Sequence, residues 1–265
     1  MKLRWLVLVL VFITSAGPAR AEGEQPTNLW FQVGEEQIYD IEWGFLDIGQ
    51  THVTTSWEEF EGRRVIAIRF RTKTYGLMDS IYPVNDLLES LVDPETFLPL
   101  RFVKKLSEGK YRADEVTLFD HANKIAKWES HKSGKKKEFA IAEDTRDIIS
   151  LMYYLRKDGF NVGGTTVHRI MADEKLYEVF VKPKKIETVK LDRFGKIETI
   201  RVEPEAAFQG LFVRKGKVTF WVSQDERRLC ARMMAEVPVA NIRLSLNKVL
   251  GPGDDLWVKP VKDRD

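Results

Sequence analysis

The sequence is poor in the residue that crosslinks many small secreted domains. Cys230 is the only cysteine among 265 residues, so no intramolecular disulfide can form. The fold must therefore depend on its hydrophobic core, which a chain of this length is able to supply. Apolar and polar residues alternate around Cys230, and this pattern favours an ordinary strand cysteine over a redox centre.

Long hydrophobic runs are also missing. After residue 21, no stretch approaches the roughly 18 apolar residues that a transmembrane helix needs.

The charges are nearly balanced, with 42 Lys and Arg against 40 Asp and Glu. Three of the cations and none of the acids lie in residues 1–21, so the remainder carries a net charge of −1. This balance gives no general attraction to nucleic acid, and we expect no nucleic-acid partner.

Catalytic and metal-binding motifs are not found in the sequence. Its four histidines and its carboxylates lack the short spacing of metal ligands, so we expect neither a metal nor a cofactor. Two S-x-x-K matches, at Ser107 and Ser133, lack the companion motifs of penicillin-binding enzymes. Asp114 and Glu115 are adjacent and would point to opposite faces of a strand. The sequence therefore predicts a protein without catalytic activity.

The first 21 residues have the layout of a secretory signal peptide. Lys2 and Arg4 precede an apolar run over residues 5–14, and Ala19 and Ala21 form a small-x-small cleavage site. We expect export, cleavage after Ala21, and a soluble periplasmic protein.

Short segments of alternating apolar and polar residues fill most of the remaining chain. Tyr39, Ile41 and Trp43, for example, share one face of such a segment. These segments recur at roughly ten-residue spacing with turn residues between them, which is typical of antiparallel β structure. The sequence predicts one β-rich domain over residues 35–250.

The flanks and two internal segments are less regular. Residues 22–34 are expected to form a loose lead-in and residues 251–265 a flexible tail. Asn85–Val92 and Asp225–Glu236 contain good helix formers, but both also alternate, and we expect strands.

One segment has helical periodicity. Its apolar residues recur at helical spacing within residues 145–157, with Asp144 placed to cap the start; they are Ile148, Ile149, Leu151, Met152 and Leu155. The stripe that they form needs a cover, and only the inner face of the sheet offers a large apolar surface. We therefore predict a mainly β fold, in which a single curved antiparallel sheet, or open barrel, wraps around one helix.

Candidate ligand-binding residues come from a basic hairpin and from the aromatics. Cations alternate with apolar residues between positions 101 and 112 and would suit an anionic lipid or glycan, although pairing with nearby acids is more common. Aromatic residues on strands are usually core, but they could also line an apolar cleft. The candidates are Arg101, Lys105, Arg112, Trp43, Trp128 and Tyr82.

Several motifs together resemble an exported bacterial family, the domain of unknown function 3108. They include YGLMDSIYPV from Tyr75, ESLVDPETFLPL from Glu89, LMYYLR from Leu151 and KVTFWVSQDERR from Lys217. The likeness extends from about Gly34 to Asn247. It implies a β-rich envelope domain, shaped by analogy like the periplasmic lipoprotein carriers, and it supplies no catalytic residues.

These observations predict one function and leave two alternatives open. We expect a periplasmic envelope protein that binds or carries a lipid-like or peptide ligand on a concave apolar face. The first alternative is a structural or interaction module that pairs through exposed strand edges with an envelope protein. The second is an envelope hydrolase whose site the sequence does not reveal. A carrier requires an apolar cavity, an interaction module a long open edge, and an enzyme converging titratable groups.

Overall fold

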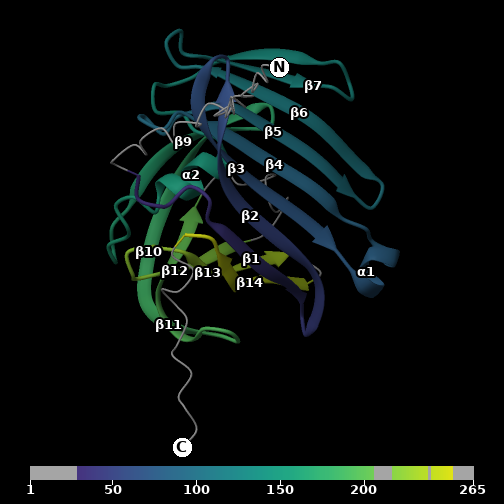
Figure 1. The fold of residues 1–265 in the computed structure, drawn as a ribbon, viewed down its shortest axis with the longest axis vertical. Helices are drawn as coiled ribbons and strands as arrows, with labels where there is room; N and C mark the ends of the chain where they lie inside the picture. The colour runs from purple at the N-terminus through teal and green to yellow at the C-terminus, as the bar shows by residue number, and fades with distance from the viewer. Residues whose placement is uncertain (1–28, 206–216, 238–239, 253–265) are drawn as a thin grey trace, which may run out of the picture.

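Antiparallel strands dominate the fold. The computed structural model describes residues 29–205, 217–237 and 240–252, in which fourteen strands form one antiparallel sheet. The sheet curves strongly, and helix α2 (Ile148–Tyr154) lies on its concave side (Figure 1). This confirms the predicted open sheet around a helix. The proposed signal peptide, residues 22–28 of the lead-in and residues 253–265 of the tail lie outside the described residues.

The strands follow one another closely along the chain. They are β1 (Glu36–Trp43), β2 (Leu46–Phe60), β3 (Arg63–Thr74), β4 (Asn85–Val92), β5 (Pro99–Glu108), β6 (Tyr111–Asp120), β7 (Ile125–Ser130), β8 (Lys136–Ala140), β9 (Thr166–Ala172), β10 (Lys175–Leu191), β11 (Gly195–Glu205), β12 (Lys217–Ser223), β13 (Cys230–Val237) and β14 (Ala240–Leu250). Asn85–Val92 is a strand, as the alternation predicted. The strand expected over Asp225–Glu236 begins only at Cys230, because the Asp225 carboxylate accepts hydrogen bonds from the N–H groups of Arg227 and Arg228 and holds a turn.

The order of strands in the sheet follows the chain with one exception. Reading across the sheet, the order is β8-β7-β6-β5-β4-β3-β2-β1-β14-β13-β12-β11-β10-β9, so every neighbouring pair is consecutive except β1 and β14. The two edge strands, β8 and β9, are therefore adjacent in the chain, and the segment that carries α2 connects them. Within that segment Arg146 pairs with β9, donating from its N–H to the Arg169 carbonyl at 2.9 Å.

Ion pairs link the turn after β9 to the opposite half of the sheet. Lys104 on β5 pairs with Asp173, and Lys137 on β8 pairs with Glu174. Asp173 and Glu174 form the turn between β9 and β10. The two edges of the sheet are thus joined by side chains, although their backbones do not pair.

Helix α2 is shorter than the predicted helix over residues 145–157. It begins at Ile148, and its cap is Asp147 rather than Asp144. The Asp147 carboxylate accepts a hydrogen bond from the Ser150 N–H at 2.9 Å, and the Ser150 hydroxyl accepts one from the Asp147 N–H at 3.1 Å. The helix starts late because the backbone of Arg146 is committed to β9. The predicted helix is therefore confirmed, and it is three residues shorter at each end.

A second helix, α1 (Gly76–Ile81), connects β3 to β4 and was not predicted. It has six residues, none of them buried. A segment of this length is too short to show helical periodicity in the sequence. No helix in the described ranges is long and apolar enough to cross a lipid bilayer.

The described part of the lead-in is packed rather than loose. Trp30 donates from its indole N–H to the Tyr153 carbonyl at 2.7 Å, and its ring lies 4.6 Å from that of Phe97. Phe31 is buried, 4.9 Å from the Tyr153 ring. Residues 29–34 therefore pack against α2, because aromatic residues bury large areas when a partner surface is available. The prediction of a loose lead-in was wrong for these residues.

Candidate ligand-binding cavity

A cavity lies between the concave face of the sheet and α2. Its volume is about 390 Å³, within the range of about 300–1,000 Å³ that small-molecule pockets occupy. Strands contribute every second residue to its wall, as in Phe70, Thr72 and Thr74 of β3. The alternation that predicted the strands thus also builds one continuous wall.

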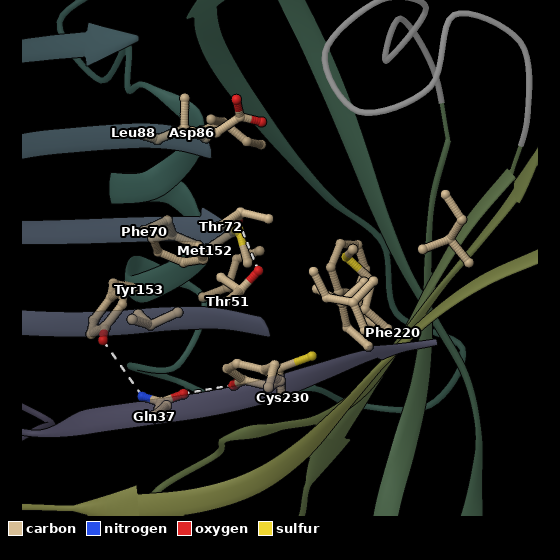
Figure 2. A pocket seen from close by; sticks show the side chains of 18 of the residues that line it. Gln37, Thr51, Phe70, Thr72, Asp86, Leu88, Met152, Tyr153, Phe220 and Cys230 are labelled. Atoms are coloured by element: carbon tan, nitrogen blue, oxygen red, sulfur yellow. Dashed lines mark hydrogen bonds between the residues drawn. The ribbon is translucent and has the colours of Figure 1, made fainter. Parts of the chain in front are cut away.

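Most of the wall is hydrophobic. Figure 2 shows Phe70 and Met152 on one side of the cavity and Phe220 on the other. Leu88 extends the first side and Leu244 contributes from β14. Burial of apolar surface is worth roughly 25 cal/mol per Å², so this wall is suited to an acyl chain or another apolar group.

Two carboxyl groups form a polar site in the wall. Burial raises the pKa of Asp86 on β4 and that of Glu108 at the end of β5, and the charge of Asp86 raises the pKa of Glu108 further. When protonated, Glu108 donates a hydrogen bond to the Asp86 carboxylate, and Asp86 also accepts from the Ser107 N–H at 2.7 Å. Two carboxyl groups in this arrangement favour holding a proton between them.

Lys104 lies in the same wall, two strand positions before Leu106. It forms ion pairs with Glu115 at 3.1 Å and with Asp173. Burial by itself would lower the pKa of Lys104, but the charges and hydrogen bonds of Asp173 and Glu115 raise it above its ordinary value. Lys104 therefore stays charged and is held by its two carboxylate partners.

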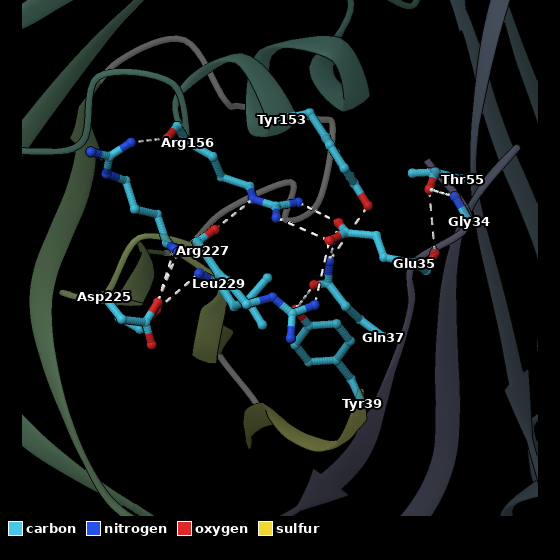
Figure 3. A network of polar contacts seen from close by, with 12 residues as sticks. Gly34, Glu35, Gln37, Tyr39, Thr55, Tyr153, Arg156, Asp225, Arg227 and Leu229 are labelled. Atoms are coloured by element: carbon cyan, nitrogen blue, oxygen red, sulfur yellow. Dashed lines mark hydrogen bonds and ion pairs between the residues drawn. The ribbon is translucent and has the colours of Figure 1, made fainter. Parts of the chain in front are cut away.

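A second polar group borders the cavity near the end of α2 (Figure 3). Glu35 is 2% exposed and receives two hydrogen bonds from Arg156, at 2.5 Å and 3.2 Å. Gln37 donates to Glu35 at 2.8 Å, and the Tyr39 hydroxyl donates to Gln37 at 2.7 Å. Gln37, Tyr39 and Arg156 all contribute to the cavity wall.

The pKa of Glu35 reflects two opposing effects. Burial raises it, but the charge and hydrogen bonds of Arg156, with the charge of Arg227, lower it below its ordinary value. Glu35 is therefore a buried carboxylate that depends on its cationic partners. This network holds residues 29–37 against the end of α2.

Cys230 also lines the cavity. Its thiol donates to the Arg232 carbonyl at 3.3 Å, and burial raises its pKa to about 12. A thiol is a good nucleophile only as the thiolate, so Cys230 is poorly reactive at neutral pH. This agrees with an ordinary strand cysteine.

None of the six sequence candidates lies in the cavity wall, although all six are described. Trp128 is 3% exposed in the core, and its indole N–H donates to Glu115 at 3.2 Å. Arg101 pairs with Glu89 at 2.8 Å. Alternation assigns a residue to one face of a strand, but it does not show whether that face meets core, cavity or an acidic neighbour.

The other four candidates are exposed and lie toward one end of the sheet. They are Trp43, Tyr82, Lys105 and Arg112. The turns β1–β2, β3–β4 and β5–β6 all lie at this end, because successive antiparallel strands reverse direction.

The carboxyl pair was missed in the sequence. Asp86 and Glu108 are far apart in the chain and meet only because β4 and β5 pair. One signal was present. Asp86 falls two positions before Leu88, and Glu108 two positions after Leu106, so each interrupts an apolar face with an acid. No group of three or more His, Cys, Asp and Glu side chains in the described ranges is placed to hold a metal ion.

Comparison with known proteins identifies the fold and the family. A crystal structure described as a beta-barrel-like protein of domain of unknown function DUF1849 from Brucella abortus matches with a TM-score of 0.53 and 13% identity. The match covers 82% of this chain and 97% of that one, and at such low identity it shows a shared fold. No curated protein matches the sequence. The family described as "Protein of unknown function (DUF3108)" matches residues 38–247, which confirms the resemblance, and the chain belongs to this family.

Proposed function

We propose that the protein binds a ligand with an apolar chain, either lipid-like or an apolar peptide, in its cavity and releases it unchanged. The observation that carries this proposal is the cavity of about 390 Å³ between the sheet and α2, with its mainly hydrophobic wall. Empty space left in a core by a large-to-small substitution lowers stability by about 24 cal/mol per Å³. A filled core would therefore be more stable, and the retained space supports a binding role.

The polar groups of the wall favour an amphipathic ligand. The Asp86–Glu108 pair lies in a wall that is otherwise mainly apolar. With one proton between them, the two carboxyl groups offer both a donor and an acceptor to a hydroxyl or amino group. The apolar part of the ligand would then lie along Phe70 and Phe220.

Strand addition has less support in this structure. Edge strand β8 has five residues, two of them lysines, and edge strand β9 already pairs with Arg146. Short, charged or covered edges are the features by which proteins avoid pairing with other strands.

A hydrolase is the second candidate, and the Asp86–Glu108 pair is the observation that favours it. Paired carboxyl groups are able to exchange a proton with a substrate. The test compares Asp86→Asn and Glu108→Gln with the parent protein on ester, amide and glycoside substrates. Hydrolysis that these substitutions abolish would support the enzyme. A parent protein that turns over none of the substrates supports binding without turnover.

We also propose that the chain is exported, cut after Ala21, and acts as a soluble periplasmic protein. The layout of residues 1–21 supports this. The mass of the protein isolated from the producing cells tests it, since a chain that begins at Glu22 is expected. A chain that retains residues 1–21 would contradict cleavage.

The first test of ligand binding is native mass spectrometry of protein purified without detergent. A discrete added mass that disappears on denaturation is the expected result. An apolar fluorescent probe, N-phenyl-1-naphthylamine, then gives an affinity for the cavity. A protein that carries no added mass and binds no probe would contradict the proposal.

Two adjacent leucines provide a matched pair of variants. Leu88 lines the cavity, whereas Leu87 lies on the other face of β4. Leu88→Trp fills part of the cavity and should weaken probe binding at least about tenfold, a change of about 1.4 kcal/mol. Leu87→Trp should leave the affinity within about twofold. Equal effects of the two substitutions would place the probe elsewhere.

A further inference from the structure

Exposed hydrophobic side chains concentrate at one end of the sheet. Phe45 is 93% exposed, Leu77 75% and Ile81 67%. We call this group the rim and define it as Trp43, Phe45, Leu46, Leu77, Ile81 and Tyr111. Scattered exposed apolar residues are normal, but a cluster marks an interaction surface.

The topology brings the rim together. The β1–β2 turn carries Phe45, helix α1 carries Leu77 and Ile81, and Tyr111 begins β6. These connections all lie at the same end of the antiparallel sheet. Figure 1 shows α1 and the β1–β2 hairpin at the lower right of the molecule.

The rim continues the inner surface of the cavity. Trp43 stands directly opposite Ile242 of β14, which lines the cavity. Tyr111 stands directly opposite Glu108, which also lines it. Residues directly opposite in an antiparallel pair share a face of the sheet. Trp43 and Tyr111 are therefore the outward ends of cavity-facing rows.

Helix α1 exposes its apolar side chains instead of burying them. Leu77 and Ile81 are four residues apart and lie on one side of the helix. A short helix that belonged to the core would bury such a pair. In α1 no residue is buried, so this apolar pair is free to contact an apolar environment outside the chain.

Cations lie on the outer face of the sheet behind the rim. Arg71, Lys73, Lys105 and Arg112 are exposed, and among the described residues none is within ion-pair distance of a carboxylate. Arg71 and Lys105 stand in one row across the sheet, both beside Leu87.

Acids also lie nearby, and one of them, the exposed Asp47, adjoins Leu46 of the rim. Asp114, opposite Lys105, lies 3.2 Å from the His131 ring nitrogen, and Asp79 accepts from the Thr74 hydroxyl at 3.1 Å. Arg71, Lys73, Lys105 and Arg112 thus form a local group of exposed cations, although the chain as a whole is nearly neutral.

We propose that the rim inserts into the surface of a membrane that contains anionic lipids, and that an amphiphile passes between the bilayer and the cavity at this end. Apolar side chains with Trp and Tyr beside them suit the boundary between acyl chains and headgroups. Exposed Lys and Arg suit the phosphates of anionic headgroups. The passage of an amphiphile rests on the proposed function, whereas the docking does not.

The test is flotation of the protein, as isolated from the producing cells, with vesicles of phosphatidylcholine alone or with about 30% phosphatidylglycerol. We expect at least about tenfold stronger partitioning to the anionic vesicles, and a loss of binding in about 0.5 M salt. Absence of partitioning to either vesicle would overturn the proposal.

Matched variants locate the contact. Phe45→Ser, Leu77→Ser and Ile81→Ser together should weaken partitioning about tenfold. The control combines Val167→Ser, Leu176→Ser and Ile186→Ser on β9 and β10, where the parent residues are 47%, 45% and 53% exposed. Equal partitioning of the two triple variants would overturn the proposal. A second outcome would also overturn it: the parent protein is a dimer, the rim variant is a monomer, and both bind vesicles equally. That result would show that the rim contacts a second copy of the chain.

Probe binding without vesicles separates the two proposals. The rim variant should retain affinity for N-phenyl-1-naphthylamine, while Leu88→Trp should lose it and still float with vesicles. If the parent protein floats with vesicles but binds no probe, membrane docking is supported and the proposed function is contradicted. If it binds the probe but does not float, the proposed function is supported and membrane docking is contradicted.

Discussion

At the level of single residues, buried charges have the largest effect on stability. Glu35 and Arg156 are almost fully buried together at the end of α2, and each hydrogen-bonds to the other. Removing one partner of such a pair leaves an uncompensated charge in the interior, which is much worse than removing both. The network is therefore sensitive to single substitutions.

Arg156→Met should destabilise the protein by about 3–5 kcal/mol, because Glu35 stays buried with less compensation. Urea denaturation measures the change. Lys127→Met is the control, because Lys127 and Glu138 form an exposed pair at 3.7 Å, and it should cost less than about 1 kcal/mol. The double variant Glu35→Met/Arg156→Met should cost less than the sum of the two single substitutions. Additive costs would contradict the coupling.

The pH dependence of stability should reveal the carboxyl pair. The pKa of Glu108 is raised in the folded protein. Its contribution to stability is therefore present at low pH and is lost as the pH rises through the raised folded value. Glu108→Gln removes this loss and should stabilise the protein at about pH 8, with little change at about pH 4. Denaturation curves at both pH values test this, and a variant that is less stable at pH 8 would contradict it.

Elements show how far local sequence patterns reach. Period-two alternation was enough to place Asn85–Val92 as a strand with its observed bounds. It failed at Asp225–Leu229, where the Asp225 side chain caps a turn. The predicted helix failed at Thr145 and Arg146 for another reason: the Thr145 N–H bonds to the Ala142 carbonyl in a turn, and the Arg146 backbone pairs with β9. Helical periodicity does not record which backbone groups are already bonded elsewhere.

The stability of the fold also depends on the residue that caps helix α2. Asp147 accepts from the Ser150 N–H and, at 2.6 Å, from the buried Ser90 hydroxyl on β4. Asp147→Ala removes the cap and leaves Ser90 unpaired, so it should cost about 2 kcal/mol by urea denaturation. Asp144→Ala, at the position where the sequence placed the cap, should cost less than about 0.5 kcal/mol. A larger cost at Asp144 would contradict the assignment.

At the scale of the whole molecule, strand identity was predictable and strand order was not. The sequence indicated short antiparallel strands around a helix, but neither the pairing of β1 with β14 nor the convergence of Asp86 with Glu108 has a local signature. The cavity likewise depends on the curvature of fourteen strands together. The same alternation would suit a filled barrel. The sequence therefore did not show whether the inward-facing side chains fill the interior or line a cavity.

The start of strand β1 and the end of strand β14 lie next to each other in space. Glu36 at the start of β1 stands directly opposite Leu250 at the end of β14, and paired strands are about 5 Å apart. A circular permutant that keeps residues 29–252, joins residue 252 to residue 29 with a flexible linker, and opens the exposed turn at Gly163 and Gly164, should keep the parent circular-dichroism spectrum. Its urea midpoint should fall by less than about 1 M. A permutant without cooperative unfolding would contradict this geometry.

The pairing of the first strand with the last has a consequence for the life of the chain before it is complete. A polypeptide that is synthesised, or threaded through a narrow pore, from its N-terminus presents β1 long before β14 exists. Half of the backbone groups of β1 then have no strand to bond, and the central part of the sheet stays open until β14 is available. The two halves of the sheet, β1–β8 and β9–β14, are therefore joined into one sheet only at a late stage of folding, through a contact of high sequence separation.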